Sequence, residues 1–276
     1  MKPFIFISLL LIGLASSKGR DAVWIAFASH MTKSAVDFAV KHKIGKIFLT
    51  QAVLSYKTEK EINSFNDYAS KKGVEIHFWL YCFYSDGNWI NPINTSTKKY
   101  NKQAFDQIIE RGKKALKLNH ISGLHLDYVR YPGTAYKYKY GKVSGINAIT
   151  SFVKKATTEW KKVNSKLVIS AAVMPEQESN AYYYGQDVTA LGKYLDVIVP
   201  MVYKGNYNSG TNWIVNTCQW FADKSKPAKV WCGLQTYRSD DNPVALPADE
   251  MKADVNAVIK AGLPAVAYFR YGLLNL

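Results

Sequence analysis

The sequence of 276 residues predicts an α/β protein that folds as a single (β/α)8 TIM barrel of parallel strands. Eight apolar runs of strand length alternate along the chain with segments in which apolar residues recur at helical spacing. Such alternation favours parallel pairing through right-handed crossovers. An open doubly wound sheet is the rival fold, and it is disfavoured because no glycine-rich phosphate-binding motif follows any predicted strand.

The first half of the chain contains four strand–helix units. In the first helix, apolar residues recur at Ala35, Val36, Ala39 and Val40, and Gly73 ends the second helix. We expect strands at 23–28, 46–51, 74–83 and 122–129, helices at 32–43, 59–72, 100–118 and 145–163, and a long polar and aromatic loop at 84–97.

The second half continues the pattern and stops early. Because the chain ends almost directly after the last strand, the last helix is expected to be short or missing. No linker, internal repeat or low-complexity tract interrupts the pattern, so one domain is predicted. We expect strands at 167–174, 195–203, 229–235 and 264–269, and helices at 213–223 and 248–261.

The first seventeen residues have the pattern of a signal peptide. Lys2 precedes an apolar run at 4–14, and Ala15-Ser16-Ser17 offers a small-residue cleavage site. We therefore expect a signal peptide at 1–17, a barrel domain at 18–276, and a secreted (extracellular or lumenal) protein. The apolar run is too short to span a bilayer, so no stable membrane insertion is expected, with an uncleaved membrane anchor as the alternative.

The net charge of +15 favours an anionic partner. An acidic polysaccharide, a cell wall, a membrane surface and a nucleic acid all qualify. The lysines are spread over polar helix faces, and no nucleic-acid-binding motif is present, so we expect no nucleic-acid partner. We predict a polysaccharide or oligosaccharide substrate, neutral or anionic, and a monomeric protein.

Three cysteines, Cys82, Cys218 and Cys232, make an odd number for an oxidising compartment. Cys82 and Cys232 lie in apolar strand patterns, which favours buried thiols, and no disulfide can be assigned from the sequence. No Cys/His spacing is typical of a zinc site, so we expect neither a metal nor another cofactor.

The most informative segment is Ser122-Gly-Leu-His-Leu-Asp-Tyr-Val-Arg-Tyr-Pro-Gly133. It is typical of a buried strand that leads into a loop, because it is mostly apolar up to Asp127 and because Pro132-Gly133 forces a turn. A carboxylate at the C-terminal end of a barrel strand is where this fold places its chemistry. An aspartate here can also simply cap the loop, but its aromatic and basic neighbours favour a functional role.

The predicted strand ends bring many aromatic and amide side chains to one mouth. Aromatic rings stack on sugar rings, and Gln, Arg and Tyr bind hydroxyl groups, which favours a carbohydrate, although a protein interface has a similar composition. Glycoside cleavage normally needs two carboxyl groups. Asp127 and Glu176 end adjacent strands and are our candidates. Glu176 lies in a polar run and can equally be a plain loop residue, in which case Glu178 is the substitute.

Other residues at or below the mouth are candidates for binding the substrate. Arg130 can hold an anionic group or an adjacent carboxylate, or form only a surface ion pair. By strand alternation His125 shares the face of Asp127, where it can bond to Asp127 or be a satisfied core histidine, and His77 similarly lies inside its strand. The substrate-binding candidates are His77, His125, Tyr128, Arg130, Tyr203, Gln235 and Arg270.

Four segments of the chain resemble the glycosyl hydrolase-like 10 group and related glycoside hydrolases with a TIM barrel. They are Ala22-Val-Trp-Ile25, Gly73-Val-Glu-Ile-His-Phe-Trp-Leu80, Ser122-Gly-Leu-His-Leu-Asp-Tyr-Val-Arg-Tyr-Pro132 and Leu195-Asp-Val-Ile-Val-Pro-Met-Val-Tyr203. The resemblance extends nearly from end to end. It implies roles in the site for His77, His125, Asp127 and Tyr203.

The chain also departs from that group. Tyr128 replaces its second aspartate, and Met174-Pro-Glu176 replaces its Ser-Pro-Phe-Gly, so the resemblance gives Glu176 no support. A more distant likeness to family 18 chitinases fails at their catalytic glutamate, where Val129 stands. We therefore expect a secreted glycoside hydrolase that cleaves an extracellular or cell-wall polysaccharide by carboxylate acid/base catalysis. The alternative is a lectin-like barrel that binds glycan and has lost the second carboxylate.

Overall fold

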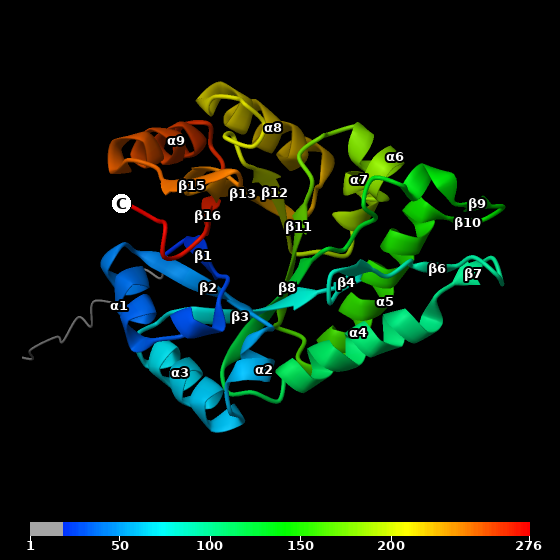
Figure 1. The fold of residues 1–276 in the computed structure, drawn as a ribbon, viewed down its shortest axis with the longest axis horizontal. Helices are drawn as coiled ribbons and strands as arrows, with labels where there is room; N and C mark the ends of the chain where they lie inside the picture. Colours follow the sequence, from blue (N-terminus) through cyan, green and yellow to red (C-terminus); the bar gives the residue numbers. More distant parts are fainter. Residues whose placement is uncertain (1–18) are drawn as a thin grey trace, which may run out of the picture.

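A computed structural model describes residues 19–276, so the predicted signal peptide at 1–17 lies outside the described residues. Eight parallel strands close into a barrel in the ring order β1, β16, β13, β12, β11, β8, β3, β2 (Figure 1). The prediction of a single (β/α)8 barrel is confirmed. The strands are β1 (Asp21–Ile25), β2 (Ile44–Thr50), β3 (Glu75–Tyr81), β8 (Ile121–Asp127), β11 (Val168–Val173), β12 (Val197–Val202), β13 (Lys229–Gln235) and β16 (Ala265–Phe269).

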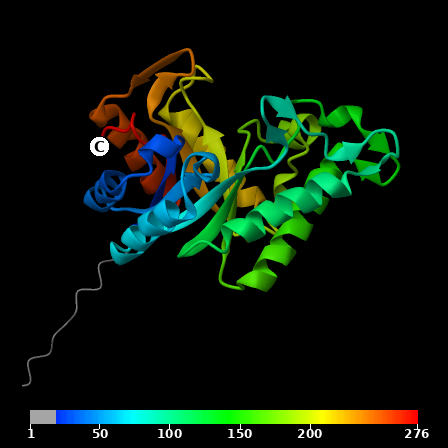
Figure 2. The ribbon, with the colours of Figure 1, turned by 60° about the horizontal axis from the view of Figure 1, so that its bottom comes forward.

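Helices surround the barrel, as Figures 1 and 2 show from two directions. Several begin at a side-chain cap: Thr58 and Glu61 form a reciprocal capping box at α3, and Ser144 caps α5. No helix follows β16, as expected, and the chain ends at Leu276. The long helices are α1 (Lys33–Lys41), α3 (Glu59–Lys71), α4 (Lys102–Ala115), α5 (Gly145–Val163), α8 (Thr211–Lys224) and α9 (Ala248–Lys260), and a short α2 (Val53–Tyr56) follows β2.

The connections at the C-terminal ends of the strands contain structure that the sequence did not predict. Between β11 and β12 lie two short helices, α6 (Ser179–Tyr184) and α7 (Val188–Leu191), because Gly185 at φ 75° ends α6 and Asp187 caps α7. Small hairpins fold other loops, and β6–β7 and β9–β10 lie at the outer end of α4 and α5 (Figure 1). The hairpins are β4–β5 (Tyr84–Ser85, Asn88–Trp89), β6–β7 (Ile93–Asn94, Lys99–Tyr100), β9–β10 (Lys139–Tyr140, Val143–Ser144) and β14–β15 (Tyr237–Ser239, Asn242–Ala245).

The core has two parts, one between the strands and the helices and one inside the barrel. Large aromatic residues from several strands fill the barrel interior, including Trp24, Phe48, Trp79 and Trp231. Interior side chains of alternate strands stack in layers, and the uppermost layer forms the floor of the mouth. The barrel is therefore closed below the mouth, and only side chains of the top layer and the loops can meet a substrate.

Cys218 of α8 and Cys232 of β13 form a disulfide with a Cα–Cα distance of 6.0 Å. The expectation of a buried thiol is therefore wrong for Cys232. The sequence could not assign the pair because helix and strand meet only in the folded barrel. Cys82 is a free, buried cysteine. No helix within 19–276 is long and apolar enough to cross a membrane.

Candidate active site

Asp127 is the last residue of β8 and points into the mouth of the barrel. Its two carboxylate oxygens each accept a hydrogen bond: Oδ2 from the indole N–H of Trp79 at 3.1 Å, and Oδ1 from the backbone N–H of Tyr128 at 2.6 Å. Trp79 belongs to the neighbouring strand β3, so two adjacent strands fix the carboxyl group. The predicted place of Asp127 at a strand end is confirmed.

Burial raises the pKa of the Asp127 carboxyl group above its ordinary value. The N–H of Tyr128, the charge of Arg130 and the indole of Trp79 each oppose this effect, in that order, and do not cancel it. A carboxyl group in these surroundings keeps its proton to a higher pH than an exposed aspartate. That property suits a general acid.

The backbone directly after Asp127 is held in an unusual conformation. Tyr128 has φ of 49°, in the left-handed region that bulky residues rarely adopt. The backbone N–H groups of Cys82 and Phe83 donate to the carbonyls of Asp127 and Tyr128 at 2.8 and 3.0 Å, which holds the turn in place. Strained backbone of this kind is often found at functional sites.

The ring of Tyr128 belongs to an aromatic wall beside Asp127. It stacks on Tyr84 at 4.7 Å between ring centroids, and Trp89 meets both rings edge to face. The guanidinium of Arg130 lies over the ring of Trp89 at 4.7 Å and near that of Tyr184 at 5.6 Å. Tyr128 and Arg130 are thus brought together with Asp127 as predicted, and hairpin β4–β5 supplies the other rings.

Glu176 lies in the loop after β11, in a cluster of its own. Its Oε1 accepts hydrogen bonds from the hydroxyl groups of Tyr184 at 3.1 Å and Tyr207 at 2.7 Å. Its Oε2 is buried and has no partner among the described residues. Arg130 is near both groups: its charge acts on Asp127 and Tyr207, and its guanidinium group lies 5.6 Å from the ring centroid of Tyr184, whose hydroxyl group donates to Glu176. No hydrogen bond joins Glu176 to Asp127 in residues 19–276.

Tyr203 follows β12, which lies two places from β8 in the ring of strands. Its ring stacks on Phe269 at 5.4 Å, and its hydroxyl group has no hydrogen-bond partner in the described part of the chain. Burial and the nearby charges of Asp127 and Asp240 raise its pKa well above the ordinary value, so the hydroxyl group stays protonated. It is available to donate to a substrate.

Gln235, the last residue of β13, is bonded to the loop that follows β12. It is buried, and its Nε2 donates to Oδ1 of Asn206 at 2.9 Å while its Oε1 accepts from the N–H of Asn206 at 3.3 Å. Asn206 continues the chain of bonds to Asp240, whose Oδ1 accepts from the hydroxyl group of Tyr237. Gln235 therefore ties the loop after β12 to β13, and any contact with sugar stays a prediction.

His77 and His125 both lie fully buried inside the barrel, below the mouth. His125 stacks on Phe48 at 3.9 Å, and its Nδ1 is 2.8 Å from Oγ of Ser170, so it has a partner other than Asp127. Burial lowers the pKa of both imidazoles, which keeps them neutral. This placement favours the core interpretation of both histidines over direct binding of sugar.

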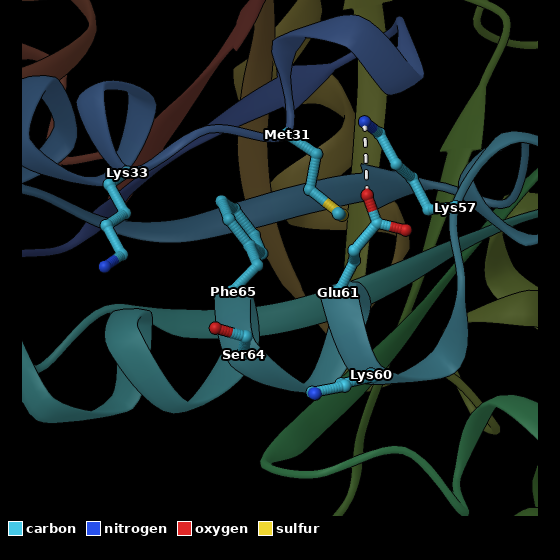
Figure 3. Close-up of a pocket in the computed structure, with 7 residues that line it drawn as sticks. All are labelled: Met31, Lys33, Lys57, Lys60, Glu61, Ser64 and Phe65. Atoms are coloured by element: carbon cyan, nitrogen blue, oxygen red, sulfur yellow. Dashed lines mark ion pairs between the residues drawn. The ribbon is translucent and has the colours of Figure 1, made fainter.

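Two hollows lie away from Asp127 and Glu176. One, of about 360 Å³, lies beside α3 and contains three lysines together with Met31, Glu61, Ser64 and Phe65; Figure 3 shows the ion pair of 3.8 Å between Lys57 and Glu61. The other, of about 650 Å³, lies at the N-terminal ends of the strands, where Lys46 and Trp231 line it.

In residues 19–276 no group of three or more His, Cys, Asp or Glu residues is arranged to hold a metal ion.

Sequence reasoning missed Trp79 and Asp240 as neighbours of the site. Trp79 could have been found, because period-two alternation places it on the same strand face as His77 and Tyr81. Asp240 could not, because it lies in a polar turn whose position depends on the packing of hairpin β14–β15.

Solved structures with the same architecture cover nearly the whole chain. One is the C-terminal domain of a putative chitinase from Desulfitobacterium hafniense DCB-2, with a TM-score of 0.68 and 14% identity over 94% of this chain and 95% of that chain. Another is the PgaB (BpsB) glycoside hydrolase domain from Bordetella bronchiseptica, with a TM-score of 0.67 and 11% identity over 91% of this chain and 94% of that chain. A third is an endo-1,4-beta-mannanase from Rhizomucor miehei, with a TM-score of 0.63 and 13% identity over 91% of this chain and 86% of that chain. At these identities the likeness shows the fold alone.

The sequence comparisons add the family. No curated protein matches the chain. A family model described as "Putative glycosyl hydrolase domain" matches residues 26–243, which is more than half of the sequence. The match does not single out the glycosyl hydrolase-like 10 group, so that narrower resemblance stays a prediction. The chain belongs to the family of glycosyl hydrolase domains that this model describes.

Proposed function

We propose that the protein is a secreted glycoside hydrolase that cleaves glycosidic bonds within an extracellular or cell-wall polysaccharide. The observation that carries this proposal is Asp127, a carboxyl group with a raised pKa at the C-terminal end of β8, surrounded by aromatic rings. In this role Asp127 gives its proton to the leaving oxygen as the glycosidic bond breaks. No metal or other cofactor is part of the proposal.

Glu176 is the proposed partner of Asp127, as the base that activates water or as the nucleophile. Its Oε1 is held by the hydroxyl groups of Tyr184 and Tyr207, which fix the orientation of the carboxyl group. A base or nucleophile needs such a fixed orientation toward the atom on which it acts. Arg130 lies near Asp127 and near Tyr184, which holds Glu176, and it can orient a sugar bound beside them.

The aromatic surfaces around Asp127 support a sugar as the substrate. Tyr128 and Trp89 on one side and Tyr203 and Phe269 on the other present ring faces or edges to the mouth. Aromatic rings pack well on the apolar faces of sugar rings. The unpaired hydroxyl group of Tyr203 offers a donor for a sugar oxygen.

Turnover of defined polysaccharides by the Asp127→Asn variant tests the proposal. Chitin oligosaccharides, β-1,4-mannan and acidic glycans such as alginate are incubated with the wild type, with Asp127→Asn and with Asp223→Asn, the same chemical change at an exposed position of α8. We expect reducing ends from the wild type and from Asp223→Asn, and at least about a hundredfold fewer from Asp127→Asn. Equal rates for the wild type and Asp127→Asn contradict the assignment.

The second candidate function is glycan binding without cleavage. Two observations favour it. In the described chain the side chain of Asp127 forms no hydrogen bond with a second carboxyl group. Tyr128 also occupies the position of a second aspartate in the group that the chain resembles. Saturable binding of an oligosaccharide, with no release of reducing ends after long incubation, supports this function over hydrolysis.

A further inference from the structure

The chain uses arginine sparingly, and it places two arginines at the mouth. Only five of its 36 basic residues are arginines. Arg130 lies three residues beyond the end of β8, and Arg270 directly follows β16. The planar guanidinium group binds a carboxylate or sulfate through paired hydrogen bonds and stacks on aromatic rings, which a lysine ammonium does less well.

The two arginines lie on opposite sides of the barrel. In the closed ring of eight strands, β8 and β16 are four places apart in either direction. Arg130 therefore borders the mouth beside Asp127, and Arg270 borders it across the ring. A glycan chain that crosses the mouth past Asp127 in this direction meets one guanidinium group on each side.

Both guanidinium groups are held by aromatic rings and lack a carboxylate partner in residues 19–276. Arg130 lies over Trp89, and its one hydrogen bond goes from Nη1 to the carbonyl of Tyr131 at 3.2 Å. Its buried Nε has no partner among the described residues. Arg270 lies over Phe27 at 4.6 Å, and within the described part of the chain its guanidinium group donates no hydrogen bond.

The basic residues next to these arginines behave differently. Lys204 follows β12 at the same end of the barrel, and it forms ion pairs with Glu250 at 3.0 Å and Asp254 at 2.6 Å. Arg238 pairs with Glu250 at 2.9 Å. These two cations at the same end of the barrel are neutralised, whereas Arg130 and Arg270 have no ion pair with a carboxylate in residues 19–276. Contact with aromatic rings restrains both guanidinium groups, so binding an anion costs less additional side-chain entropy.

We propose that the substrate is an anionic glycan and that Arg130 and Arg270 bind its acidic groups at opposite sides of the mouth. This inference rests on the proposed function and names the class of polysaccharide. The acidic groups are carboxylates, as in a uronic acid polymer, or sulfates. The overall charge of +15 attracts such a polymer, and the two arginines recognise it.

Paired polymers that differ only in charge test this inference by binding. Polygalacturonate, alginate and dextran sulfate are each compared with a neutral counterpart: methyl-esterified polygalacturonate, propylene glycol-esterified alginate and dextran. Binding constants are measured for Arg130→Gln, Arg270→Gln and Arg130→Lys in the Asp127→Asn protein, so that turnover plays no part. Lys166→Gln removes one exposed charge before β11, at the far end of the barrel, and is the matched control.

We expect at least one charged polymer to bind more tightly than its neutral counterpart, and Arg130→Gln and Arg270→Gln each to weaken that binding at least about tenfold. Arg130→Lys is expected to restore part of the loss, and Lys166→Gln to change little. A preference for dextran sulfate identifies sulfate, and a preference for the uronates identifies carboxylate. The inference is overturned if the arginine variants bind every polymer as Lys166→Gln does, whatever the result of the turnover experiment.

Discussion

The indole N–H of Trp79 donates a hydrogen bond to Oδ2 of Asp127 across 3.1 Å, and this bond joins β3 to β8 at the mouth of the barrel. The bond favours the charged form of the carboxyl group and partly opposes the effect of burial on its pKa. Trp79 is thus a positioning residue that also lowers the pKa of Asp127, after the larger effects of burial, the Tyr128 N–H and Arg130.

Replacing Trp79 with phenylalanine keeps an aromatic ring and removes the donor. Because the hydrogen bond lowers the pKa of Asp127, its loss raises that pKa further, and a general acid then stays protonated to a higher pH. We expect the basic limb of the kcat/KM profile to move to higher pH. Trp220→Phe is the control, since the indole of Trp220 donates to the carboxylate of Glu178 instead. A shift to lower pH, or equal shifts in both variants, contradicts the role of Trp79.

The hydroxyl group of Tyr207 is the closer of the two donors to Glu176, at 2.7 Å. Tyr207→Phe leaves the ring, which stacks on Trp213, and frees the carboxylate to rotate. If Glu176 acts in the chemical step, kcat falls about tenfold with KM nearly unchanged, which matches the loss of one charge-assisted hydrogen bond. Tyr184→Phe, which removes the longer bond of 3.1 Å, is expected to have a smaller effect. Unchanged kcat in both variants argues that Glu176 is only a loop residue.

The raised pKa of Asp127 also affects the pH dependence of folding. A group that binds its proton more tightly when folded contributes stability below its unfolded pKa of about 3.9, and this contribution is lost as pH rises through the folded value. Asparagine cannot titrate. The free energy of unfolding of the wild type is therefore expected to fall, relative to that of Asp127→Asn, between about pH 4 and neutral pH. Denaturant titrations at several pH values measure the difference, and the exposed Asp223→Asn is expected to show no such trend.

The buried pair of His125 and Ser170 provides a test of the two interpretations of this histidine. Ser170→Ala removes the hydrogen-bond partner of Nδ1 and leaves a buried polar atom unpaired, which costs about 1–3 kcal/mol of stability. The core interpretation predicts a lower midpoint of thermal unfolding with KM unchanged. A rise in KM without loss of stability supports a role for His125 in binding sugar.

The fold was largely predictable because each barrel strand and each long helix carries its own local signal. Eight apolar runs and their turn residues specify a closed parallel barrel almost without long-range information. The connection after β11 was not predicted, because its helices are only 6 and 4 residues long and are stabilised by Gly185 and Asp187 rather than by an apolar stripe. The pairing of Cys218 with Cys232 was also out of reach, since it depends on the packing of α8 on β13.

The positions of site residues on strands were predictable from strand periodicity, whereas the positions of site residues in loops were not. Asp127 is an example of the first kind, because the predicted end of its strand fixes its position. The partner of Gln235 was missed because Asn206 lies in a loop 29 residues earlier in the chain. Glu176 was predicted as a catalytic carboxylate, with a plain loop residue as the alternative. Its bonds to Tyr184 of α6 and Tyr207 of the loop after β12 were not predicted. Side-chain contacts between loops have no periodic signal in the sequence.

Gly123 tests how tightly the barrel is packed beneath Asp127. It lies inside β8, two layers below Asp127, and a Cβ atom added there meets the imidazole of His77. Gly123→Ala is therefore expected to destabilise the protein by about 1–3 kcal/mol through overpacking. Gly210, which has open space around its Cα, is the matched control and is expected to lose at most about 1 kcal/mol, the preference for glycine over alanine at a helix N-cap. In the His77→Ala background the added methyl group should cost less, because the clash is removed. An equal cost in both backgrounds shows that the ring of His77 does not occupy the space opposite Gly123.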